Sequence, residues 1–298
     1  MKDMNKSLQA DLNEYARTVK GSAMVDDSHF YDFRQNIYGG EMVPQIRKMF
    51  LAGDGNELVS KACAVNSSSM LGYNFFHWVS RESPLKLSFK DGSQIQYTDV
   101  LFEVKIPVLK GTRAANMDIV LKNDDGDILF IESKFLEYLF TSKFSISDTY
   151  KKESSYYFQG AKWADFISHL DTTLEKQYWG GIKQEICHLI GLTNWVNGVQ
   201  VDQLPIYEDA RSVHFINLVF EPNPEEYHKE YESFLAYRNR YNELHLKLEG
   251  LSMIPKGITM SFLTYSDIWD SFTESISPEL EGYLYKHYMK FAKNNSHY

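Results

Sequence analysis

One stretch of the chain, residues 114–135, constrains the fold more than any other; it reads AANMDIVLKNDDGDILFIESKF. Its two apolar runs, 115–121 and 128–131, are rich in Ile, Val, Leu and Phe, which is typical of largely buried strands. Between them, segment 123–127 holds Asn, Asp and Gly, residues that tolerate the left-handed backbone of a tight turn. The stretch therefore predicts a β-hairpin.

The second strand of this hairpin ends in charged residues, which a buried strand does not need for folding. Glu132 and Lys134 are two positions apart, so they project from the same face, and Ser133 projects from the other. Pairing of the hairpin brings Asp118 of the first strand close to Glu132. Two carboxylates at that distance repel unless a cation lies between them, and Mg²⁺ takes such oxygen ligands. A lysine beside the metal can orient an attacking water or stabilise charge on a phosphate.

This arrangement, an aspartate on one strand and Glu-x-Lys on the next, resembles the signature of the PD-(D/E)XK nuclease superfamily. The resemblance implies that Asp118 and Glu132 bind Mg²⁺, with Mn²⁺ as a substitute, and that the Ser133 backbone carbonyl is a third ligand. It implies that Lys134 assists the nucleophilic water in a hydrolase that cleaves nucleic acid, with DNA as the expected substrate. The sequence departs from the motif at Met117, where many members have proline.

Two other interpretations of the hairpin are weighed against this one. Glu132 and Lys134 could form a solvated strand end, with Asp118 a polar residue near a turn, but the apolar flanks argue against solvent exposure. A calcium-binding loop in LKNDDGDILFIE is excluded, because Leu121 occupies the first ligand position, where an oxygen is required.

The resemblance also implies the fold: an α/β restriction-endonuclease-like domain with an αβββαβ core, in which helices flank a mixed central sheet. We expect a single domain, 1–298, with its core at about 56–221, a helical N-terminal cap at 1–55 and a C-terminal extension at 222–298. Apolar periodicity and turn residues predict the individual elements. Helices are expected at 56–80, 178–192, 224–248 and 278–293, a hairpin of strands at 85–89 and 94–97, and strands at 101–106, 212–220 and 257–265.

Two helices are candidates for auxiliary site residues. In the superfamily the helix before the sheet sometimes donates an acidic ligand, and Glu57 is the only acidic residue of segment 56–80; its alternative is a carboxylate favoured by the helix dipole. In several branches the helix after Glu-x-Lys carries a glutamine that contacts the site, which points to Gln184. His188 shares its face at i, i+4, and the alternative for both is a solvated helix face.

Several other polar and aromatic residues receive structural interpretations. Strand 101–106 alternates, so Glu103 is expected opposite Phe102 and Val104, as a surface carboxylate rather than a residue that faces the site. His77 is expected to be a packed histidine. Four aromatic residues after the hairpin could stack on nucleobases, but core packing is favoured for them. They are Tyr156, Tyr157, Phe158 and Trp163.

Charge and composition limit the function classes. The net charge of −9 at pH 7 argues against a constitutive, high-affinity nucleic-acid binder but not against a nuclease with a local basic strip. There is no apolar run of membrane-spanning length and no signal peptide pattern, and Cys63 and Cys187 fit buried, reduced thiols, so a cytoplasmic protein is expected. The candidates for the basic strip are Lys105, Lys110, Arg113, Lys134, Lys143, Lys151 and Lys152.

Two further function classes compete with the nuclease. One is a catalytically inactive nuclease-fold protein that binds nucleic acid or a protein partner. The other is a metal-independent interaction protein that uses its aromatic, acidic C-terminal helices. The complete set of Asp118, Glu132 and Lys134 favours the enzyme, because an inactive scaffold need not keep all three. A homodimer is among the expected states, since many members of the superfamily dimerise to cut both strands.

Overall fold

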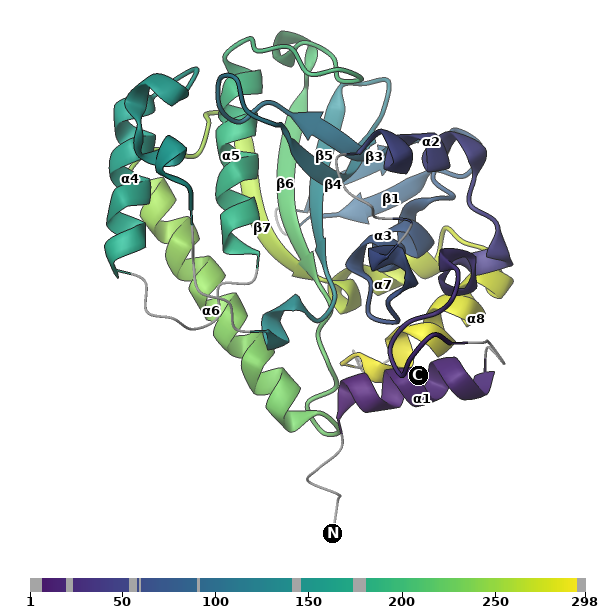
Figure 1. Cartoon of the computed structure of the whole chain (residues 1–298). Helices are drawn as coiled ribbons and strands as arrows, with labels where there is room; N and C mark the ends of the chain where they lie inside the picture. Colours follow the sequence, from purple (N-terminus) through teal and green to yellow (C-terminus); the bar gives the residue numbers. More distant parts are fainter. Residues whose placement is uncertain are drawn as a thin grey trace.

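A mixed five-stranded sheet forms the centre of the molecule, and helices cover both of its faces (Figure 1). The computed structural model describes residues 7–19, 24–53, 58, 60–89, 92–140, 146–173 and 181–293. The strand order is β3-β4-β5-β6-β7, and a separate hairpin, β1-β2, lies beside the sheet. The strands are β1 (Leu85–Ser88), β2 (Gln94–Tyr97), β3 (Asp99–Ile106), β4 (Ala115–Lys122), β5 (Asp127–Lys134), β6 (Ser212–Val219) and β7 (Ile258–Thr264).

Strand direction follows from the length of each connection. β3, β4 and β5 are antiparallel neighbours, whereas β5, β6 and β7 run parallel, with helices in the connections between them. The β4–β5 turn is closed by the Asn123 side chain, whose Oδ1 accepts from the backbone N–H of Asp127 at 2.9 Å. Gly126 has φ +87°, and a Cβ there would lie 2.7 Å from the Asp209 carbonyl oxygen, so the turn requires glycine. The predicted hairpin is confirmed.

Two hydrophobic cores lie on the two faces of the sheet. One contains Trp163, Ile186 and Leu244 from α4, α5 and α6. The other contains Phe75 and Phe272 from α3 and α7, and the β1–β2 hairpin also packs there. The helices are α1 (Leu8–Val19), α2 (Pro44–Ala52), α3 (Ser68–Phe76), α4 (Gly160–Thr173), α5 (Ile182–Val196), α6 (His228–Gly250), α7 (Tyr265–Thr273) and α8 (Pro278–His287).

All four expected helices begin or end elsewhere; the one expected at 178–192 is α5, which ends at Val196. The continuous helix at 56–80 is wrong: α3 begins only at Ser68, because Ser67 caps it by accepting from the Met70 N–H at 3.3 Å. The helix expected from 224 begins at His228, after a turn in which the Asn223 carbonyl accepts from the Tyr227 N–H. The closing helix ends at His287 and is followed by a 3₁₀ turn, Met289–Phe291.

The order α3, β3–β5, α5, β6 is the expected αβββαβ arrangement, and the mixed α/β fold is confirmed. β7 adds a fifth strand, parallel to β6, at the edge of the sheet. In the part of the chain that the structure describes, no helix has both the length and the apolar character needed to cross a membrane.

Candidate active site

The site lies where β4 and β5 stop pairing with each other. Their pairing runs from Lys122↔Ile128 to Ile119↔Ile131, although β4 begins at Ala115 and β5 continues to Lys134. Beyond this point the Asp118 carboxylate accepts the Ser133 backbone N–H at 2.9 Å, so a side chain replaces the missing ladder acceptor. The same hydrogen bond fixes Asp118 beside the Glu-x-Lys segment.

Lys134 joins this strand end to α5. Its ammonium donates to Glu132 Oε1 and, at 2.8 Å, to Gln184 Oε1. Glu132 is 0% exposed and Lys134 is 4% exposed, so each charge is buried and is stabilised by the other. Gln184 is itself an exposed residue of α5, and it lies with Asp118, Glu132 and Lys134 as the sequence predicts.

The pKa values of these groups are set by burial and by mutual interaction. Burial, followed by the charge of Glu132, holds the pKa of Asp118 well above its ordinary value. Burial also raises the pKa of Glu132, and the Lys134 ammonium opposes that rise. For Lys134, burial lowers the pKa, but the carboxylates of Glu132 and Asp118 outweigh it, so its pKa is raised. Lys134 is therefore an ammonium in this arrangement.

His188 is buried beneath the same strand ends. It is 1% exposed, its Nε2 lies 3.0 Å from the Asn116 carbonyl oxygen, and its Nδ1 lies 3.2 Å from Glu132 Oε2. Burial, with a contribution from the Lys134 charge, lowers the pKa of His188 to about 3. A solvated helix face is thus wrong for His188, because α5 packs over β4 at this point.

Glu185 is a buried carboxyl that the sequence interpretation missed. It is 0% exposed, and neither carboxyl oxygen has a hydrogen bond of good geometry within the described residues. Burial and then the charge of Glu132 raise its pKa well above the ordinary value. The available signal was its position between Ile182 and Leu189, in the apolar stripe of the helix.

Glu103 is the second acidic residue whose position differs from expectation. It is only 9% exposed, has φ +53°, and lines the same pocket as Asp118. Because β3 turns at Glu103, Phe102 packs in the α3-side core while Val104 packs in the α5-side core. Both the regular alternation and the surface carboxylate are therefore wrong.

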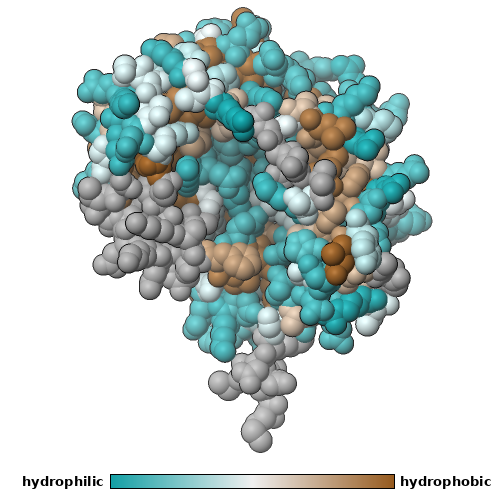
Figure 2. Space-filling model, viewed as in Figure 1, coloured by the Kyte–Doolittle hydropathy of each residue, from teal (hydrophilic) through white to brown (hydrophobic). Residues whose placement is uncertain are grey.

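These groups surround a pocket of about 790 Å³. Figure 2 shows a hydrophilic hollow at this place, between the α5 side and the α2–α3 side of the molecule. Glu132 lies beneath the pocket rather than on its wall. The polar lining includes Lys61, Ser68, Ser69, Glu103, Arg113, Asn116, Asp118, Lys134, Glu137, Lys183, Gln184 and His188.

A family model matches most of the chain, residues 47–289, and its description is REase-ARP, Restriction Endonuclease associating with ARP. The chain belongs to this family. The match confirms the resemblance to restriction-endonuclease-like proteins, and it indicates a nuclease-like function for the REase-ARP chain. Comparison with curated proteins and with solved structures gives no significant match.

The donor atoms of this REase-ARP site fit a hard divalent cation that keeps part of its water shell. Asp118 and Glu132 supply two carboxylates whose pKa values are raised by burial, and Glu132 Oε2 lacks a hydrogen-bond partner within the described residues. No set of three or more His, Cys, Asp and Glu side chains in the described ranges is arranged as a complete metal site. Glu57, the predicted additional ligand, lies outside the described residues.

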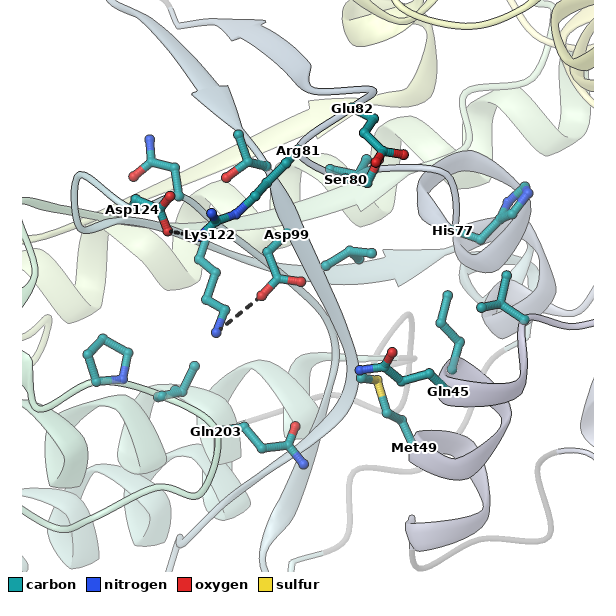
Figure 3. A pocket seen from close by; sticks show the side chains of 18 residues that line it. Gln45, Met49, His77, Ser80, Arg81, Glu82, Asp99, Lys122, Asp124 and Gln203 are labelled. Carbon is teal, nitrogen blue, oxygen red and sulfur yellow. Dashed lines mark hydrogen bonds and ion pairs between the residues drawn. The ribbon is translucent and has the colours of Figure 1, made fainter.

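A larger pocket of about 970 Å³ lies near the turn end of the β4–β5 hairpin. Figure 3 shows two ion pairs in it: Lys122 contacts Asp99 at 3.3 Å, and Arg81 contacts Asp124 at 2.8 Å. His77 also lines this pocket, and its ring stacks on Tyr73, as expected of a packed histidine. The Arg81–Asp124 pair is largely exposed to solvent, whereas the Lys134–Glu132 pair is buried, so the pocket of Asp118 and Lys134 is the better candidate for catalysis.

Proposed function

We propose that this chain is a metal-dependent nuclease that hydrolyses phosphodiester bonds of DNA. The observation that carries the proposal is the opening between β4 and β5, where Asp118, Glu132 and Lys134 meet under a hydrophilic pocket. Membership of a family described as a restriction endonuclease supports it. The alternative of a solvated strand end finds no support, because Glu132 and Lys134 are buried.

In this proposal Asp118, Glu132 and the Ser133 carbonyl hold a divalent cation. When bound, Mg²⁺ or Mn²⁺ supplies Lewis-acid stabilisation of the phosphate and lowers the pKa of a water. The Lys134 ammonium, held by Gln184 at 2.8 Å, orients the attacking water and stabilises the developing negative charge. The water oxygen forms a bond to phosphorus and releases a proton to bulk solvent, while the phosphorus–oxygen bond of the leaving group breaks and the leaving oxygen takes up a proton from solvent.

The proposal also covers the substrate, the cellular compartment and the oligomeric state. Lys61, Arg113 and Lys183 come from separate parts of the chain and line the same pocket, where they suit the phosphates on either side of the cleaved bond. The buried thiols of Cys63 and Cys187 suit a reducing cytoplasm. A homodimer would bring two such sites to the two strands of a duplex.

Cleavage of plasmid and single-stranded DNA tests the proposal directly. We expect the purified chain to cut DNA with Mg²⁺ or Mn²⁺, to stop in EDTA, and to lose cleavage in Asp118→Ala. A folded protein that binds DNA in a salt-dependent manner but cuts it with neither metal would point to an inactive nuclease-fold scaffold. Absence of any Mg²⁺ or Mn²⁺ binding by calorimetry would favour the metal-independent interaction protein.

Lys134→Ala separates catalysis from metal binding. We expect this variant to lose cleavage but to bind metal in calorimetry, because the lysine acts on water and phosphate while the carboxylates stay in place. Lys122→Ala is the control, since Lys122 belongs to the same sheet but pairs with Asp99 in the other pocket. Unchanged cleavage in Lys134→Ala would refute the role given to the lysine.

A further inference from the structure

A smaller pocket, of about 330 Å³, adjoins the candidate active site. The two pockets share four lining residues: Lys61, Ser68, Ser69 and Glu137. Ser68 begins α3, and its carbonyl oxygen accepts from Ser133 Oγ at 3.2 Å, so this shared wall is bound to the Glu-x-Lys segment. A nucleic-acid strand that passes the active site can therefore continue into the smaller pocket.

Phe140 gives this smaller pocket an exposed aromatic ring. It is 60% exposed, whereas Phe135 and Tyr138, which precede it in the same segment, are 0% and 1% exposed. It lines the pocket together with Glu137, which begins the short 3₁₀ turn before it. The ring therefore contributes little to the core, and much of its surface is accessible to a flat ligand of the kind that stacks on aromatic side chains.

The rest of the lining determines which ligand fits. Among the described residues around this pocket, only Ala64 and Phe140 are apolar. The polar ones are His29, Ser60, Lys61, Asn66, Ser67, Ser68, Ser69 and Glu137. An apolar side chain of a protein partner would remove these groups from water without giving them hydrogen bonds, which is costly. A nucleobase has apolar faces for Phe140 and polar edges for hydroxyl and amide groups, so it suits both parts of the lining.

We propose that this pocket binds an unpaired base of the DNA, with Phe140 as the stacking surface, beside the phosphodiester that is cleaved. The inference rests on the proposed function and adds the substrate class. A base inside a duplex is stacked on both faces, so only an unpaired or extruded base can reach an aromatic side chain. Lys61 lines both pockets and suits the phosphate that links the two nucleotides. The preferred substrate thus has an unpaired nucleotide at the cleavage site.

Fluorescence anisotropy in EDTA tests base binding without cleavage. The probes are oligothymidylate and a strand of the same length made of abasic nucleotides, which carries the same phosphates but no bases. We expect wild type to bind oligothymidylate on the order of 10-fold more tightly. Phe140→Ala should remove most of this preference and leave the affinity for the abasic strand unchanged, whereas Phe140→Trp should keep the preference. Tyr285→Ala removes an exposed ring of α8 and is the control, which should behave as wild type.

Cleavage with Mg²⁺ or Mn²⁺ then locates the base. One abasic position moved along a single strand should lower cleavage at the bond that it flanks by roughly 5-fold or more in wild type, but not in Phe140→Ala. Wild-type protein that binds neither strand, or both equally, would overturn this inference, as would a Phe140→Ala effect of the same size on both strands. Metal-dependent cleavage would still support the nuclease in those cases. A Phe140-dependent preference for bases in a protein that cuts no DNA would support base binding and overturn the proposed nuclease.

Discussion

Glu103 has a backbone conformation that L-residues rarely adopt within a strand. Its φ of +53° is in the left-handed region, which costs about 1–3 kcal/mol for a residue with a side chain. The carboxylate nonetheless lines the pocket with Asp118, and a Cβ placed on Gly53 would lie 3.5 Å from Glu103 Oε2. Strain of this kind persists where the surrounding structure imposes it, and it is concentrated at functional sites.

Replacing Glu103 by glycine should separate stability from activity. Glycine adopts positive φ without strain, so we expect the free energy of unfolding of Glu103→Gly to stay within about 1 kcal/mol of wild type or to rise. DNA cleavage should fall, because the pocket loses a carboxylate. Val104→Gly is the control, because Val104 has no such strain and the change removes a core side chain. Its free energy of unfolding, measured in urea, should fall by about 3 kcal/mol. Equal destabilisation of the two variants would contradict the claim that the Glu103 backbone is strained.

Glu185 makes stability depend on pH. Its unfolded carboxyl ionises near pH 4, whereas its pKa in the folded protein is raised. As pH rises from about 4, the unfolded chain releases this proton while the folded chain keeps it. The free energy of unfolding therefore decreases as pH rises. We expect Glu185→Gln to be more stable than wild type by up to about 3 kcal/mol at pH 7, with almost no difference at pH 4.

The measurement for Glu185 is urea unfolding of both proteins at the two pH values. Glu243→Gln is the matched control, because Glu243 has an exposed side chain on α6 and should leave stability unchanged at both. A Glu185→Gln effect that is the same at pH 4 and pH 7 would mean that packing, and not ionisation, causes it.

At the scale of elements, the position of α5 decides how the site is assembled. This helix supplies Gln184, Glu185 and His188, and it lies close to β3 at one glycine. A Cβ added to Gly191 would lie 2.4 Å from Ile106 Cγ2, which no real contact allows. The close approach of α5 to the sheet therefore depends on the absence of a side chain at Gly191.

Alanine should lower the stability of the protein at Gly191 and raise it at Gly282. Gly191→Ala forces α5 away from β3, so we expect a loss of about 1–3 kcal/mol in thermal unfolding and reduced cleavage, because His188 and Gln184 move with the helix. Gly282 in α8 has no atom within 4 Å of an added Cβ, so Gly282→Ala should gain about 0.5–1 kcal/mol and leave cleavage unchanged. Similar effects at both sites would argue against the close contact.

Elements that depend on local signals were predictable from the sequence. The β4–β5 hairpin followed from its turn residues, and Asp118, Glu132 and Lys134 followed from the two strands that this turn joins. The packing of α5 and β4 on their neighbours buries Glu185 and His188 and imposes the positive φ of Glu103. No local sequence pattern predicts such packing. Ser67 is the N-cap of α3 rather than a residue of the helix interior, and apolar periodicity alone does not distinguish these two positions.

At the scale of the whole molecule, charge works against binding to DNA. The chain carries a net charge of −9, so non-specific attraction to a polyanion is weak and local cations must supply the binding energy. The pocket gathers three of them, Lys61, Arg113 and Lys183, around the acidic site residues. Binding should therefore depend on a few phosphate contacts, each of which contributes a measurable part of the salt dependence.

The Lys183→Gln variant tests one such phosphate contact. If Lys183 contacts a phosphate, the variant should bind DNA more weakly at low salt, and the slope of log K against log salt should become shallower by about 1. Fluorescence anisotropy in EDTA follows binding without cleavage. Lys286→Gln, an exposed lysine of α8, is the control and should keep the wild-type slope. Because both variants have the same net charge, an equal change of slope in the two would mean that overall charge, and not the pocket, governs DNA binding.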